Sequence, residues 1–370
     1  MAAERIVSAD SHVIEPADVW TARMESRFAD RAPHVVQNHG KLKGDFFVCE
    51  DLPPTSVKGF ALAGEDPKEW FRVTKAGYAG VRPGAWDPTE RIKDQERDGV
   101  AAEVLYPSLA MSLFQLQDGE LRAASFRAYN DWLADYVSQN PRRLAGVGLI
   151  PLDDPATGAA ELERVARKGL KGGMIWAEPP GEHPYHDPIY DTFWAAAQDH
   201  GTPLSLHILT ERKRDAGAAA DFLIKYPSLQ HSTQRSLSGF VFGGVLERFP
   251  RLKLVSVEND IGWIDHFIQR TDHAYDKFRF TAKNIIPNLP SFYFHRQMAL
   301  TFMDDARGLR QRYDIGVESI MWSTDYPHPA SFFPHSQEIL QQDFAGVPDR
   351  DKHKIVYENA AELYGFDMPS

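Results

Sequence analysis

The chain has 370 residues and a formal net charge of -11, with 43% hydrophobic and 25% charged residues. Such a composition is typical of a globular protein with a sizeable core. The acidic balance argues against nucleic acid or an anionic membrane surface as a partner. The single cysteine, Cys49, excludes an intrachain disulfide and a zinc-finger or iron–sulfur site. The charged opening segment is not typical of a signal peptide, and no apolar run approaches the roughly 18 residues of a membrane span. We therefore expect a cytoplasmic protein.

Eight short apolar segments are typical of buried strands, because each is rich in Val, Ile, Leu, Phe or Tyr and is bounded by Gly, Pro, Asp or Asn. The predicted strands are Arg5–His12, Ala101–Pro107, Leu144–Pro151, Gly173–Ala177, Pro203–Ile208, Leu252–Val257, Phe292–Phe302 and Ile320–Ser323.

Helical patterns separate most of these strands. The predicted helices are Leu121–Gln139, Ala156–Lys168, Ile189–Asp199, Trp263–Phe278 and Arg350–Tyr364. Alternating strands and helices predict parallel βαβ units. Eight such units favour an α/β fold of the TIM-barrel type, a (β/α)8 barrel whose sheet closes on itself. A doubly wound open sheet is the alternative. We interpret residues 1–370 as one domain.

One long interruption follows the first predicted strand. Residues 37–87 contain many Gly, Pro and Lys residues and no long periodic run. We interpret this segment as an insertion in the first strand-to-helix loop. Such loops build the substrate pocket at the mouth of a barrel, so we expect the insertion to lie over that mouth.

The first candidate for chemistry is the pair Asp10 and His12 on the first strand. Residues two apart on a strand point to the same face, so both side chains can face the barrel axis. A carboxylate and an imidazole that converge form half of a divalent-metal site. The simpler interpretation is a surface pair at a strand end.

Two further residues are predicted at the same end of the barrel. His207 interrupts the apolar fifth strand near its carboxyl end, and Asp325 follows the eighth strand. A strand histidine is often only a hydrogen-bonded core residue, and an aspartate in this position can simply order a turn. The first and eighth strands are neighbours in a closed barrel, however, so Asp325 should stand close to Asp10 and His12. Together these residues predict one metal site.

At this point the sequence resembles the amidohydrolase-related family, the branch of the amidohydrolase superfamily that includes aminocarboxymuconate-semialdehyde decarboxylase and the resorcylate decarboxylases. The likeness spans nearly the whole chain. The residues and segments that carry it are Asp10-Ser11-His12, Glu15-Pro16, His207, residues 243–253, Thr324-Asp325-Tyr326-Pro327-His328 and residues 357–365.

The resemblance implies metal ligands at Asp10, His12, His207 and Asp325, with Asp325 also handling a proton. Zinc or manganese is the expected ion. A metal lowers the pKa of bound water towards about 7, and an adjacent carboxylate can take its proton. The family contains hydrolases, non-oxidative decarboxylases and a diiron monooxygenase, so it leaves the reaction open.

The sequence departs from the family at the end of the sixth strand. Many family decarboxylases carry a histidine there that assists proton transfer, whereas this chain has Glu258. Glu258 is therefore a candidate catalytic residue. Together with His231 and His328 it could also hold a second metal ion, and two irons are the alternative to a single zinc or manganese. The simpler interpretation is that Glu258 orients a ligand histidine and His328 orders its turn.

Three other residues stand at the predicted mouth of the barrel, and two of them, Arg235 and Trp176, are candidates for substrate binding. Arg235 follows His231 on a predicted helix and could bind an anionic substrate group, because guanidinium binds carboxylates bidentately; a solvated surface arginine is the simpler interpretation. Trp176 could supply an apolar pocket wall, although most aromatic residues in such positions are core. Glu178 is a further carboxylate at the mouth, either a ligand or an ion-pair partner.

The leading hypothesis is metal-assisted hydrolysis of a small amide, ester or lactone, with Asp325 as general base. Decarboxylation of an aromatic or enol acid is the second hypothesis, and oxygen activation at two irons is the third. A barrel that binds a partner without catalysis is the non-enzymatic alternative. No Walker, Gly-x-Gly-x-x-Gly or Gly-x-Ser-x-Gly motif is present, which argues against nucleotide chemistry and serine hydrolysis. The resemblance makes a homodimer possible, since dimers are common in the family, and the sequence leaves the oligomeric state open.

Overall fold

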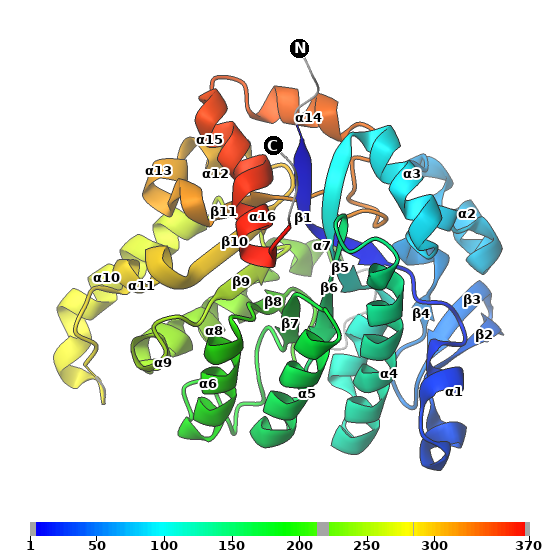
Figure 1. Cartoon of the computed structure of the whole chain (residues 1–370), viewed down its shortest axis with the longest axis horizontal. Helices are drawn as coiled ribbons and strands as arrows, with labels where there is room; N and C mark the ends of the chain where they lie inside the picture. The colour runs from blue at the N-terminus through cyan, green and yellow to red at the C-terminus, as the bar shows by residue number, and fades with distance from the viewer. Residues whose placement is uncertain (1–4, 213–221, 284, 367–370) are drawn as a thin grey trace.

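The computed structural model describes residues 5–212, 222–283 and 285–366 (Figure 1). Eight parallel strands form one sheet in the order β1-β5-β6-β7-β8-β9-β10-β11. Nearly all of their residues are buried, as expected for strands covered on both faces. The strands are β1 (Ile6–Val13), β5 (Val100–Pro107), β6 (Leu144–Leu149), β7 (Gly172–Ile175), β8 (Leu204–His207), β9 (Leu254–Val257), β10 (Met298–Phe302) and β11 (Ile320–Trp322).

The first and last strands of this sheet meet and close the barrel. The amide of Asp325, just beyond β11, donates to the carbonyl of Asp10 on β1 at 3.0 Å. The amide of His12 donates to the carbonyl of Tyr326 at 2.6 Å. The predicted (β/α)8 TIM barrel is therefore confirmed, and the open sheet is excluded.

Helices surround the barrel, and α4, α5 and α6 lie side by side on its outside (Figure 1). Four of the α-helices begin at aspartate N-caps, Asp87, Asp118, Asp154 and Asp305, whose carboxylates accept backbone N–H bonds. The α-helices are α1 (Val19–Arg23), α2 (Trp70–Val73), α3 (Pro88–Asp98), α4 (Gly119–Ser138), α5 (Pro155–Arg167), α6 (Asp191–His200), α7 (Phe222–Lys225), α8 (Gln230–Phe242), α9 (Val245–Arg248), α10 (Ile264–Phe278), α11 (Pro290–Gln297), α12 (Ala306–Arg310), α13 (Arg312–Ile315), α14 (Ser336–Asp343), α15 (Asp349–His353) and α16 (Asn359–Tyr364).

Two predicted elements differ from the structure. The seventh strand was expected over Phe292–Phe302, but helix α11 occupies its first half and the strand begins at Met298. Pro290 starts this helix, and its aromatic residues Tyr293 and Phe294 pack inward, so the aromatic run that favours a strand belongs to a helix. The predicted closing helix is divided by a π-helical segment at Lys354–Glu358.

The segment after β1 contains a small antiparallel sheet that the sequence did not predict. Its strands are β2 (His34–His39), β3 (Leu42–Val48) and β4 (Thr55–Ser56). Most residues of β2 are exposed, so no apolar alternation marks the strand in the sequence. Beyond this sheet, the amide of Ala63 donates to the carbonyl of Pro327 at 3.0 Å, which joins the segment to the loop after β11.

None of the helices formed by the described residues has the length and apolarity needed to cross a membrane.

Candidate metal centre

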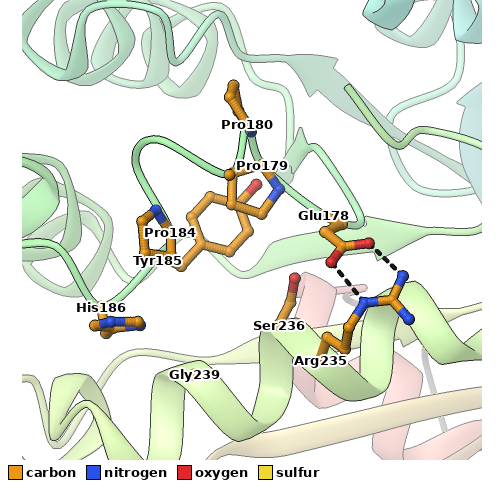
Figure 2. Close-up of a pocket in the computed structure, with 10 residues that line it drawn as sticks. Glu178, Pro179, Pro180, Pro184, Tyr185, His186, Arg235, Ser236 and Gly239 are labelled. Atoms are coloured by element: carbon orange, nitrogen blue, oxygen red, sulfur yellow. Dashed lines mark hydrogen bonds and ion pairs between the residues drawn. The ribbon is translucent and has the colours of Figure 1, made fainter. Parts of the chain in front are cut away.

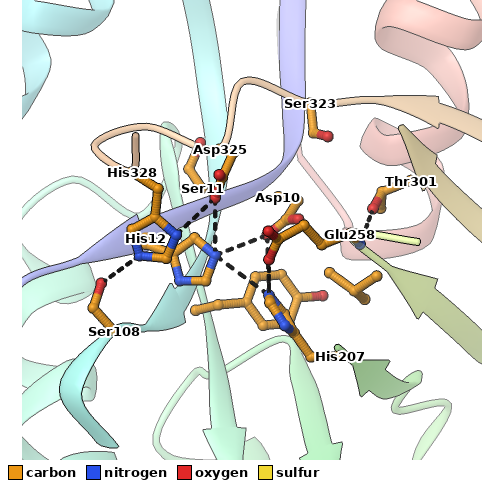
Figure 3. A network of polar contacts seen from close by, with 12 residues as sticks. Asp10, Ser11, His12, Ser108, His207, Glu258, Thr301, Ser323, Asp325 and His328 are labelled. Carbon is orange, nitrogen blue, oxygen red and sulfur yellow. Dashed lines mark hydrogen bonds and ion pairs between the residues drawn. The ribbon is translucent and has the colours of Figure 1, made fainter. Parts of the chain in front are cut away.

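The polar residues of the barrel mouth come from the carboxyl ends of different strands, where TIM-barrel active sites form. Figure 3 shows them facing a common centre. β1 contributes Asp10 and His12, and β8 ends at His207. Glu258 directly follows β9, and Asp325 follows β11.

Two overlapping sets of these side chains could each hold a metal ion, because their potential ligand atoms all lie within 4.8 Å of one another. The first set is Asp10, His12, His207 and Glu258, and the second is His12, Glu258, Asp325 and His328. The Nε2 atom of His12 lies 3.4 Å from Asp10 Oδ1 and 3.3 Å from Asp325 Oδ1. The Nε2 atom of His207 lies 3.7 Å from Asp10 Oδ1 and 3.5 Å from Glu258 Oε2.

Backbone carbonyls orient both central imidazoles. His12 Nδ1 lies 2.6 Å from the carbonyl oxygen of Pro107, and His207 Nδ1 lies 3.1 Å from that of Ile208. Each Nδ1 therefore carries the proton and donates it, which leaves the Nε2 lone pair directed at the centre. Metal-binding histidines are commonly fixed by such a hydrogen bond from the second ring nitrogen.

The backbone is strained where these strands end. Leu209, Glu258 and Asp325 have positive φ values of 65°, 57° and 51°, a region that costs non-glycine residues free energy and is concentrated at functional sites. Hydrogen bonds hold two of these positions: the Glu258 amide donates to Thr301 Oγ1 at 2.9 Å, and the Asp325 amide donates to the Asp10 carbonyl at 3.0 Å.

The electrostatics of the centre fit a divalent cation. Both carboxylate oxygens of Asp10 and of Asp325 are buried, and no hydrogen bond from the described residues reaches them. Burial raises the pKa of Asp325 to about 7, with the charge of Asp10 adding to the effect. Burial and the charges of Asp325 and Asp10 also raise the pKa of Glu258 well above its usual value. A cation among these three carboxylates would compensate their charges and reverse the shifts.

The imidazoles of His12 and His328 are neutral. Burial, and after it the nearby His328, lowers the pKa of His12 to about 4. Burial likewise lowers the pKa of His328 to about 3. Neutral imidazoles and ionised carboxylates are the forms that bind manganese, zinc or iron. The donor set therefore fits such an ion at neutral pH.

Comparison with known proteins decides the family. The sequence profile described as amidohydrolase matches residues 80–366 of this chain. The chain belongs to the amidohydrolase family. Its resemblance to the branch that contains aminocarboxymuconate-semialdehyde and resorcylate decarboxylases is likewise confirmed.

Three relatives of this amidohydrolase are informative. The 2-amino-3-carboxymuconate-6-semialdehyde decarboxylase of Dictyostelium discoideum is 25% identical over 295 residues, which cover 78% of this chain and 80% of the relative. The gamma-resorcylate decarboxylase of Rhodococcus jostii is 26% identical and covers 78% of this chain and 94% of its own. A Polaromonas dihydroxybenzoic acid decarboxylase, solved with bound manganese and the inhibitor 2-nitroresorcinol, superposes with a TM-score of 0.67 at 18% identity, over 99% of this chain and 98% of its own.

These relatives correct the leading functional hypothesis. Hydrolysis of an amide, ester or lactone was expected, but the relatives described above are named decarboxylases. The hydrolysis hypothesis was wrong because a carboxylate–imidazole site around a divalent ion can polarise either a carbonyl or a carboxylate. The sequence of the ligand residues alone does not separate the two reactions.

The structure does not bring every candidate residue of this amidohydrolase to the metal centre. His231 is exposed on α8 and is absent from both sets of potential ligands. Trp176 is buried, and its indole N–H donates to the carbonyl of Phe114 at 3.0 Å. Trp176 is therefore placed as a core residue, the simpler of its two interpretations.

Arg235 lies beside a separate small pocket rather than at the metal centre. Its guanidinium forms a bidentate ion pair with Glu178, with Nε–Oε1 and Nη2–Oε2 distances of 2.6 and 2.5 Å (Figure 2). The adjoining pocket holds about 180 Å³ and lies between the loop after β7 and helix α8. Because Glu178 already occupies both arms of the guanidinium, the structure offers Arg235 an internal partner in place of a substrate carboxylate.

Sequence reasoning missed Ser108 and Arg91. Ser108 lies 2.9 Å from His328 Nε2, and Arg91 donates to the carbonyl of His12 at 2.7 Å. The only sequence signal for Ser108 is its position directly after the second barrel strand. Arg91 lies on helix α3, and no pattern in the sequence marks it as buried.

Proposed function

We propose that this chain is a metal-dependent, non-oxidative decarboxylase of a small aromatic or enolic carboxylic acid. Two supports come from different sources. The relatives in the branch are decarboxylases of such acids, and the barrel mouth gathers buried carboxylates and neutral imidazoles with potential ligand atoms within 4.8 Å of one another. The clustered donors are the observation that carries the proposal.

The proposed ion is manganese, which the related structure holds, with zinc or iron as alternatives. Asp10, His12, His207 and Asp325 are the proposed ligands. When bound, the ion supplies a Lewis acid that fixes the substrate carboxylate and a neighbouring hydroxyl. The barrel itself excludes water from the ligand residues, since Asp10, His12 and His207 have no exposed surface.

Asp325 is the proposed proton donor. Loss of carbon dioxide leaves an electron pair on the carbon that carried the carboxyl group, and a proton must replace the carboxyl group there. Asp325 faces the centre (Figure 3), so its carboxyl group can take up a proton there and pass it to that carbon. Glu258 stands where many family decarboxylases carry a proton-transferring histidine, and we propose that its carboxyl group takes over this role.

Release of carbon dioxide tests the proposal. The protein is stripped with a chelator, reloaded with manganese and given a panel of hydroxybenzoates labelled with ¹³C at the carboxyl group, including 2,6-dihydroxybenzoate. Labelled carbon dioxide should appear only with the metal and should be lost in Asp325→Asn. Asp135→Asn is the matched control, because Asp135, on α4, is exposed and forms an ion pair with Arg23. No release from any acid, or unchanged release in Asp325→Asn, would refute the proposal.

The second set of potential ligands supports one further candidate. His12, Glu258, Asp325 and His328 form a second overlapping group, so a site with two irons that activates oxygen stays a prediction. Elemental analysis separates the two: the decarboxylase should hold one ion per chain, whereas the diiron site should hold two irons and consume oxygen. A homodimer, the cytoplasmic location and the extent of the insertion over the mouth also stay predictions.

A further inference from the structure

His328 is held between two aromatic rings. Its imidazole stacks on His12 with a centroid distance of 3.8 Å and an interplanar angle of 23°. The ring of Phe60, from the segment after β1, lies 5.1 Å from that of His328. Only 4% of His328 is exposed. These contacts fix the plane of the ring. The hydrogen-bond partners of its two nitrogen atoms then determine which way the ring faces in that plane.

Each ring nitrogen of His328 faces one oxygen atom (Figure 3). Nε2 is hydrogen-bonded to Ser108 Oγ at 2.9 Å. Nδ1 lies 3.0 Å from Asp325 Oδ1. This second contact has hydrogen-bond length but not the alignment of a hydrogen bond, so a hydrogen bond here requires the carboxylate to turn about its soft terminal torsion.

Ser108 is itself rigidly placed. It directly follows Pro107, whose carbonyl is the partner of His12 Nδ1. The next two amides, of Leu109 and Ala110, donate to the buried carboxylate of Glu15 at 2.9 and 3.0 Å. Ser108 is 1% exposed. Its hydroxyl therefore reaches His328 from a backbone fixed on both sides.

The partners determine where the proton of a neutral His328 must be. An ionised Asp325 only accepts hydrogen bonds, whereas a serine hydroxyl can donate or accept. With the proton on Nδ1, His328 donates to Asp325 and accepts from Ser108. With the proton on Nε2, two lone pairs would face each other across 3.0 Å.

We propose that Ser108 is a positioning residue: by donating to His328 Nε2 it fixes the ring so that Nδ1–H holds Oδ1 of Asp325. The carboxylate would then be held in place at the centre, where Oδ1 also lies 3.3 Å from His12 Nε2. This inference rests on the proposed function for its kinetic consequence only. Because both ring nitrogens are occupied in this arrangement, the inference predicts that His328 is not a metal ligand, which separates it from the two-iron alternative.

The kinetic test compares three variants of the manganese-loaded enzyme with the most active acid of the panel. Ser108→Ala should lower kcat about tenfold, the factor expected for one lost hydrogen bond, with KM and manganese content unchanged. Ser108→Thr keeps the hydroxyl and should restore most of kcat. Ser125→Ala is the matched control, because Ser125 is a buried serine whose hydroxyl donates to Leu121 within α4. An unchanged kcat in Ser108→Ala, or equal losses in Ser108→Ala and Ser125→Ala, would overturn the inference.

A spectroscopic test does not depend on activity and so separates the inference from the proposed function. The zinc-loaded protein is labelled with ¹⁵N-histidine, and the signals of His328 are assigned by their loss in His328→Gln. Nδ1 should show the shift of a protonated nitrogen and Nε2 that of an acceptor, and Ser108→Ala should move the Nε2 signal. A proton on Nε2, a metal-bound shift on either nitrogen, or no movement of the Nε2 signal in Ser108→Ala would overturn it.

Discussion

Removing the guanidinium of Arg91 should destabilise the protein strongly. Arg91, on α3, has no exposed side-chain surface, and its partner Glu103, on β5, is 3% exposed. The two form a bidentate pair with Nε–Oε2 and Nη2–Oε1 distances of 2.6 and 2.9 Å. Arg91→Met removes the positive charge and leaves a buried carboxylate without a counter-charge.

The expected loss is about 3–5 kcal/mol, the range for breaking a buried ion pair by removing one partner. Arg91→Met/Glu103→Gln should recover most of it, because the second change removes the unpaired charge and keeps an acceptor for Gln95, whose amide donates to Glu103 at 2.6 Å. About 1–2 kcal/mol should stay lost, since the donor to the carbonyl of His12, 2.7 Å away, is gone in both variants.

Urea unfolding at pH 7.5 measures these differences, and the same titration at pH 5 provides an internal check. The unpaired Glu103 of Arg91→Met should have a raised pKa in the folded state, so part of the loss should disappear as pH falls and the carboxyl group is protonated. A loss under about 1 kcal/mol, or a double variant no more stable than Arg91→Met, would refute the view that this pair supports the backbone of the metal centre.

Three other changes have defined outcomes. Burial raises the pKa of Glu15 from 4.5 to about 7, so the folded apoprotein binds the extra proton and its stability should fall by about 3 kcal/mol as pH rises between these values. Glu15→Gln should make the pH dependence of urea unfolding shallower than that of the wild type by about this amount, and an unchanged pH dependence would contradict the assignment. Asp10→Ala removes two buried oxygens that face the centre and should lower manganese affinity at least tenfold in a calorimetric titration; wild-type affinity would exclude Asp10 as a ligand. His231→Ala should leave the manganese content unchanged because the ring is exposed. A lower manganese content in this variant would instead indicate that His231 is a metal ligand.

The barrel could be predicted because its strands are short, apolar and buried on both faces, so each stands out from the polar loops around it. The cluster could be predicted because Asp10, His12 and His207 lie on such strands, where the two-residue period fixes the side-chain direction. Asp325 could be assigned to the same cluster because it follows the last strand, which is the neighbour of the first strand in a closed barrel. These inferences need only the local pattern and the closure of the barrel.

Other features depend on contacts that no local pattern encodes. The partner of Arg235 is Glu178, 57 positions away, and the partner of His328 is Ser108, 220 positions away. His231 and His328 are equally plausible as ligands in the sequence, but one is exposed on a helix and the other is buried beside His12. The reaction type could not be predicted either, because the same ligand residues serve hydrolysis and decarboxylation.

Anomalous diffraction at the manganese edge, from crystals of the reloaded protein, tests the central claim most directly. The claim predicts one peak per chain, at about 2.0–2.3 Å from oxygen or Nε2 atoms of Asp10, His12, His207 and Asp325. A mouth without a peak after reloading, or an ion bound elsewhere while these four side chains stay uncoordinated, would contradict it.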